Sequence, residues 1–93
     1  MYQVWYVPGS PQSEILARRQ EFGHHLRVLR TGRRLTQEVL GERAGLDRKT
    51  VNRIENGRYS PLLDQIFLIA DALEVHPSEL FRSNGVTHAE GEA

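Results

Sequence analysis

The sequence predicts an all-α fold, and three observations support that class. Apolar residues recur at helical spacings of three and four between residues 11 and 81. Good N-cap residues precede the periodic segments: Ser10, Thr36 and Asp47. Glycine or Asn-Gly follows them, where helices end. We therefore expect an extended N-terminal arm at 1–10, a helical domain at 11–82 and a disordered tail at 83–93.

The first helix is predicted from about Pro11 to Thr31. Ser10 is its N-cap and Pro11 suits the first helical position. Gly32 fits the position just after the helix. Gly23 lies inside the helix and costs about 1 kcal/mol of helix stability relative to alanine. A break near Arg19–Gly23 is therefore an alternative. The apolar face comprises Ile15, Phe22, Leu26 and Leu29.

Two short helices follow, at Gln37–Ala44 and Arg48–Glu55. Thr36 and Asp47 cap them, and Asn56-Gly57 ends the second. Gly45 between them permits the left-handed backbone of a tight turn. The inward positions are Leu40, Ala44, Leu46, Val51 and Ile54, and Gly41 stands where a large side chain would push the two helices apart.

Two further helices complete the prediction. Ser60-Pro61 begins one that continues to about Glu74. Its apolar stripe comprises Leu62, Ile66, Ile69, Ala70 and Leu73. His76-Pro77 opens the last, Pro77–Phe81, which adds Leu80 and Phe81 to the core.

Residues 37–56 are typical of a helix-turn-helix: a supporting helix, a sharp turn and a helix whose polar face points outward. An ordinary three-helix bundle with the same packing is the alternative. The net charge is zero, but residues 18–58 carry eleven Arg or Lys and five Asp or Glu, a net +6. This basic segment favours a phosphate-bearing partner, although a solvated charged surface is the other interpretation.

Several other classes of protein are disfavoured. Without cysteine, the chain offers no disulfide or thiolate zinc site. No apolar run approaches the roughly 20 residues that span a bilayer, and the start lacks a signal-peptide pattern, so we expect no membrane and a cytoplasmic, nucleoid-associated location. His24 and His25 point about 100° apart on a helix and cannot chelate one metal together. We expect no metal, no cofactor and no enzymatic activity.

Residues 22–81 resemble the Cro and lambda-repressor-like (Xre-like) helix-turn-helix family. The motifs that carry the resemblance are Leu35–Leu40, Ala44–Leu46, Thr50–Gly57, Ile69–Leu73 and Glu79–Phe81, with Leu26, Leu29 and Arg30 before them and Pro61 between them. The resemblance covers about two thirds of the chain. It implies a compact five-helix domain that binds double-stranded DNA without a cofactor, usually as a homodimer on a palindromic operator.

The resemblance also implies roles for individual residues. Arg48, Lys49, Thr50 and Arg53 match base-reading, groove-facing positions, and Asn52 lies on the flank of the same helix. Gln37 matches the phosphate-binding residue at the start of the supporting helix, and Asn56 and Arg58 are placed for phosphate beyond the recognition helix. Each could instead be a solvated surface side chain. Arg30 and Glu55 match a structural ion pair between the first helix and the recognition helix.

Two departures from the family pattern matter. Gly41 stands where alanine is common, which weakens that helix slightly. Arg48 and Lys49 replace the amide side chains of some members, which favours a half-site that contains guanine.

The resulting prediction is a sequence-specific transcriptional regulator, a repressor, that reads the major groove with helix 48–55 as a dimer. The alternative is an antitoxin or adaptor whose main partner is another protein, a toxin or a regulator. Three interpretations of Tyr2–Val7 stay open: packing on its own domain, a dimerisation element between subunits, or disorder.

Overall fold

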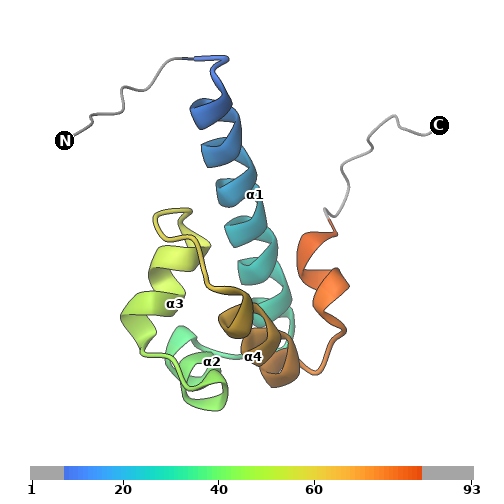
Figure 1. Ribbon diagram of the computed structural model, residues 1–93. Helices are drawn as coiled ribbons and strands as arrows, with labels where there is room; N and C mark the ends of the chain where they lie inside the picture. Colours follow the sequence, from blue (N-terminus) through green and yellow to red (C-terminus); the bar gives the residue numbers. More distant parts are fainter. Residues whose placement is uncertain (1–7, 83–93) are drawn as a thin grey trace.

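The computed structural model describes residues 8–82, which form four α-helices and one short 3-10 helix (Figure 1). In chain order these are α1 (Pro11–Gly32), α2 (Gln37–Ala44), α3 (Arg48–Glu55), α4 (Leu63–Leu73) and η1 (Pro77–Phe81). No strand occurs within the described range, and the predicted all-α class is confirmed. Residues 1–7 and 83–93 lie outside it, so the predictions of an extended arm and a disordered tail stay predictions.

The long helix α1 packs closely against two of the other four elements. It contacts α3 and η1, while α2 contacts α3 and α4. Figure 1 shows α3 and η1 on opposite sides of α1, with the first turns of α1 extending past both. This arrangement leaves one full face of α3 free of other helices.

The N-caps predicted at Ser10, Thr36 and Asp47 are present. The side-chain oxygens of Ser10, Thr36 and Asp47 accept hydrogen bonds from the backbone N–H three residues on, at 3.1, 3.0 and 2.7 Å. Gly45 has the expected left-handed backbone, with φ of 76°. These local signals explain why the predicted bounds of α2 and α3 match the structure.

The end of α1 differs from the prediction. The helix includes Gly32, and the left-handed residue is Arg34, with φ of 59°. The Leu35 N–H donates to the Arg30 carbonyl oxygen at 3.1 Å, and the Arg30 guanidinium donates to the Leu35 carbonyl oxygen at 2.7 Å. Because this pair of bonds fixes the chain reversal, the turn falls after Gly32 rather than at it.

The start of α4 was also predicted wrongly. The helix begins at Leu63 rather than at Ser60-Pro61. The Gln65 side-chain oxygen accepts from the Leu62 N–H at 2.9 Å and from the Tyr59 hydroxyl at 3.0 Å. Capping therefore comes from a side chain inside the helix, which the search for a Ser or Thr N-cap did not consider.

The core is a single cluster of buried apolar residues from every helix: Leu26, Leu40, Ala44, Val51, Ile54, Ile66, Ile69, Ala70, Leu73 and Leu80. Three predicted core residues are instead exposed. Ile15, near the start of α1, is 54% exposed, and Leu62 and Phe81 are 63% and 65% exposed. Phe81 lies at the surface with its ring centroid 5.1 Å from that of Phe22.

Gly23 does not break α1, which is continuous through it. A Cβ built at Gly23 would overlap the carbonyl oxygens of Ile54 and Glu55 at the end of α3. The absence of a side chain therefore allows α1 and α3 to approach closely, which offsets the helix propensity that glycine lacks.

We expect Gly23→Ala to lower the free energy of unfolding by about 1–3 kcal/mol, because backbone atoms of α3 must move to admit the methyl group. The matched control is Gly32→Ala at the end of the same helix, where no heavy atom lies within 4 Å of the added Cβ. There alanine should be neutral or stabilising by up to about 1 kcal/mol. Urea unfolding followed by circular dichroism measures both variants, and equal stability of the two would contradict this account of the α1–α3 contact.

Candidate nucleic-acid interface

The helix-turn-helix is held by close contact between the turn and α2. The Leu46 N–H donates to the Gly41 carbonyl oxygen at 2.8 Å, and a Cβ at Gly41 would overlap the Leu46 carbonyl oxygen. The predicted crowding at Gly41 is therefore present. Four of the predicted inward residues are buried and Leu46 is partly buried against them. The motif is a closely packed unit whose α3 is supported along one side.

A buried ion pair joins α1 to α3. The Arg30 guanidinium donates from Nε to Glu55 Oε2 at 2.6 Å and from Nη2 to Glu55 Oε1 at 3.0 Å. Both residues are more than nine-tenths buried. The pair implied by the family resemblance is thus present, in the bidentate geometry that gives arginine–carboxylate pairs their strength.

The carboxylate of Glu55 also binds Gln37 at the start of α2. Gln37 Nε2 donates to Glu55 Oε1 at 3.0 Å, and Asn52 Nδ2 donates to Gln37 Oε1 at 3.3 Å. Asn56 Nδ2 in turn donates to the Asn52 carbonyl oxygen at 2.9 Å. Three of the residues predicted to contact DNA therefore belong to one hydrogen-bonded chain that starts at the buried ion pair. The sequence did not predict this series of hydrogen bonds.

The outward face of α3 is centred on Lys49 and Arg53. The buried residues Val51, Ile54 and Glu55 define the inward face. At about 100° per residue, the direction opposite to them falls between Lys49 and Arg53, which are four residues apart. Both side chains are exposed, and within residues 8–82 neither side chain makes a hydrogen bond or ion pair. Two cationic side chains thus stand next to one another on the free face of the helix.

The remaining predicted residues lie around this centre. Arg48 is exposed in the first turn of α3, and Thr50 is half-buried at the flank. Arg58 is exposed just after the left-handed Gly57. The structure therefore gathers the eight predicted residues along α3 and at the two chain segments that border it.

One contact that sequence reasoning did not find holds the end of α3. Arg19 Nε donates to the Gly57 carbonyl oxygen at 2.7 Å, across 38 residues of sequence. Gln20 lies against Gly57, where any Cβ would crowd it. No local pattern in the sequence predicts this contact. It joins the segment that carries Asn56 and Arg58 to α1.

The pKa of the Asp47 carboxyl is held below its usual value. The largest cause is the backbone hydrogen bond from Thr50, followed by the Thr50 side chain, and the charges of Lys49 and Arg53 act in the same direction. Burial opposes the shift. Since the folded state favours the ionised cap, Asp47 stabilises the domain above its unfolded pKa, and that stabilisation is lost as the pH falls through the folded pKa.

Replacing Asp47 with asparagine tests this dependence, because asparagine caps helices comparably but does not titrate. Wild type should lose more stability than Asp47→Asn when the pH falls from 7 to below about 4, the ordinary range of an aspartate. Urea midpoints at the two pH values provide the comparison. Parallel losses in the two proteins would mean that the Asp47 charge contributes nothing.

The described residues also bear on other kinds of site. No helix between residues 8 and 82 is long and apolar enough to cross a bilayer. In the same range, no three His, Asp or Glu side chains are grouped to hold a metal ion. Two histidines have structural partners: His25 Nε2 lies 2.8 Å from the Glu79 carbonyl oxygen, and His76 caps η1 by accepting from the Ser78 N–H.

Comparison with known proteins gives consistent matches. The model of a helix-turn-helix family matches residues 26–80. An uncharacterized HTH-type transcriptional regulator of Methanothermobacter thermautotrophicus is 48% identical over 48 residues, which are 50% of this chain and 70% of that protein. The immunity repressor protein of Bacillus phage phi105 is 36% identical over 58 residues, 62% of this chain, and the match spans only 40% of the repressor.

Among solved structures, the restriction-modification controller protein C.AhdI of Aeromonas hydrophila is similar to this chain. Its TM-score is 0.69 at 43% sequence identity, over 70% of this chain and 98% of the controller protein. The range matched by the family model, residues 26–80, includes α2, the turn and α3, which carry the candidate interface.

Proposed function

This chain belongs to the helix-turn-helix family of the Xre and Cro type, and from that premise we propose that it is a DNA-binding transcriptional regulator that represses by occupying an operator. The observation that carries the proposal is the free, cationic outward face of α3 on a helix fixed by a buried ion pair. A rigid helix with unpaired donors on its outer face has the shape and chemistry to read base edges in the major groove.

Lys49 and Arg53 are the leading base-reading residues. Both side chains carry hydrogen-bond donors that have no intramolecular partner within the described range, and guanine O6 and N7 are complementary acceptors. Arg48 and Thr50 border them, and Asn52 is a weaker candidate because it lies on the flank of α3, where one of its two amide hydrogens goes to Gln37. The outward charges favour a half-site that contains guanine.

Phosphate contacts would come from Gln37, Asn56 and Arg58. The Gln37 amide has two hydrogens and Glu55 takes one of them, which leaves the second for a phosphate oxygen. Asn56 and Arg58 follow α3 and lie on a segment that Arg19 holds in place. Together with the +6 charge of residues 18–58, these contacts predict an affinity that falls steeply with salt.

The proposal includes a homodimer whose contact surface is the exposed side of α4. Phe67 and Leu68 are 47% and 44% exposed. Large apolar side chains grouped on a surface usually mark an interface. A two-fold pair would place its two α3 helices about 34 Å apart, one turn of DNA.

We expect Leu68→Glu to convert the dimer to a monomer in sedimentation equilibrium without changing the helical content. Deletion of residues 1–9 should leave the dimer intact, since that segment is assigned no part in the contact. A dimer that survives Leu68→Glu and is lost on the deletion would instead assign the interface to the N-terminal arm.

Selection of duplexes from a randomised library tests the function itself. We expect enriched sequences with two inverted half-sites, centred about 10 base pairs apart and containing guanine. Half-sites of A and T alone would refute the guanine assignment. No enrichment at low salt would refute the proposal and favour the alternative of a protein-interaction module.

A further inference from the structure

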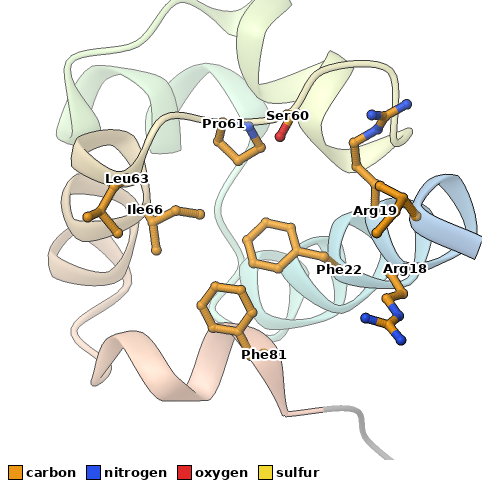
Figure 2. A pocket seen from close by; sticks show the side chains of 9 residues that line it. Arg18, Arg19, Phe22, Ser60, Pro61, Leu63, Ile66 and Phe81 are labelled. Atoms are coloured by element: carbon orange, nitrogen blue, oxygen red, sulfur yellow. The ribbon is translucent and has the colours of Figure 1, made fainter. Parts of the chain in front are cut away.

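An apolar groove of about 480 Å³ lies where the first half of α1, the start of α4 and the end of η1 meet (Figure 2). Phe22 from α1 and Phe81 from η1 point into it with their rings side by side, and Pro61 and Leu63 border it. Ile15 and Ile66 add to the apolar lining, while Arg18, Arg19 and Ser60 supply polar atoms at the rim. None of the eight side chains proposed to contact DNA lines this groove.

The lining of the groove is more apolar than an ordinary solvent-exposed surface. Ile15, Leu63 and Phe81, which all line it, are more than half exposed. Exposed apolar side chains gathered around a hollow generally mark a binding site. The groove is therefore a candidate binding surface for an apolar or aromatic segment.

We propose that the groove binds residues 1–7 of the same chain. That segment reads MYQVWYV and contains no charged side chain. Its one tryptophan and two tyrosines combine apolar rings with one polar atom each, which suits a groove open to water on one side. Arg18 at the rim is also a partner for an aromatic face.

The length of the segment and its point of attachment support this occupant. Pro8 and Gly9 lie directly before α1, and Gly9 has φ of 82°, a conformation used in tight chain reversals. Ile15 is about one turn into α1, and Phe22 lies about 10 Å further along the helix axis. Seven extended residues span at most about 25 Å. If the chain reverses at Gly9, residues 1–7 can therefore run antiparallel to α1 along the whole groove.

The tether favours this segment over a separate molecule. A short connection holds an attached ligand at an effective concentration of roughly millimolar. A free peptide of equal intrinsic affinity would have to exceed that concentration to displace it. Of the three interpretations that the sequence left open for Tyr2–Val7, this proposal selects packing on its own domain and does not depend on DNA binding.

Trp5 reports the occupancy directly, because it is the only tryptophan in the chain. In the full-length protein we expect its emission at shorter wavelength, and its quenching by acrylamide several-fold slower, than in the urea-unfolded chain. Ile15→Ser and Leu63→Ser, on opposite walls of the groove, should move both readings toward the unfolded values. The matched control is Val28→Ser, a 39% exposed apolar residue of α1 that does not line the groove.

Three outcomes would overturn the proposal. Trp5 could be quenched as fast in the folded as in the unfolded protein, which would mean that the segment is solvated. The groove variants and Val28→Ser could behave alike, which would place Trp5 elsewhere. The protected signal could disappear on dilution together with the dimer, which would assign the groove to the arm of a second copy.

Binding of the selected duplex, measured on the same variants, separates this proposal from the proposed function. Ile15→Ser should bind DNA within about twofold of wild type, since no groove residue belongs to the interface. A solvated Trp5 with normal DNA affinity would reject the groove proposal alone. A protected Trp5 in a protein that enriches no duplex would reject the proposed function alone.

Discussion

Glu55→Ala is expected to remove about 3–5 kcal/mol of folding stability, because it leaves the Arg30 guanidinium buried without its counter-charge. At about 4–8 °C per kcal/mol for a domain of this size, the melting temperature should fall by more than about 12 °C. Gln37 also loses its acceptor, so the start of α2 loosens together with α3. Thermal and urea unfolding followed by circular dichroism measure the loss.

The exposed pair of Arg82 and Glu79 provides the control. Its charged atoms lie 3.5 Å apart, and the Arg82 side chain is 70% exposed. Arg82→Ala should therefore change stability by less than about 1 kcal/mol. Similar losses in the two variants would mean that burial of the Arg30–Glu55 pair contributes little.

Lys49→Ala and Arg53→Ala are each expected to weaken binding to the selected duplex by about 1–3 kcal/mol. At 1.4 kcal/mol per factor of ten, this is a loss of about five- to 150-fold. Both side chains are exposed and make no hydrogen bond or ion pair within residues 8–82, so neither variant should unfold more easily than wild type. Fluorescence anisotropy with a labelled duplex gives the affinities.

Arg27→Ala is the matched control, since it removes an exposed cation of the same basic segment that lies on α1 rather than on α3. It should lower the affinity for selected and scrambled duplexes equally and only slightly. If Arg27→Ala and Arg53→Ala gave the same change, the outward charges of α3 would act only as general attraction for phosphate.

The local part of the fold was predictable from the sequence. Thr36, Gly45 and Asp47 each act on backbone groups within three residues, so reading them in order was sufficient to place α2 and α3. The same reasoning placed Gly32 wrongly, because the turn after α1 depends on a bond between the Arg30 side chain and Leu35.

Contacts between distant segments were not predictable in this way. Gly23 was read as a weakness in α1, although its role depends on carbonyl oxygens of α3 more than 30 residues away. Ile15 has the spacing of a core residue, but periodicity along one helix does not tell how far the neighbouring helices extend.

The family resemblance predicted which residues contact DNA, and the geometry of the structure ranks those residues. The resemblance treated Gln37 and Asn52 as DNA contacts alone, whereas the structure also ties both to Glu55 and so to the ion pair. The inward face of α3, defined by Val51, Ile54 and Glu55, singles out Lys49 and Arg53 among the outward residues.

The central claim is that the outward face of α3 reads bases, and affinity measured across single-base-pair substitutions of the selected duplex tests it most directly. Wild type should discriminate at each contacted position. Arg53→Ala should lose discrimination at one base pair in each half-site while keeping it elsewhere. A uniform loss of affinity at all positions, with the pattern of discrimination unchanged, would contradict the claim.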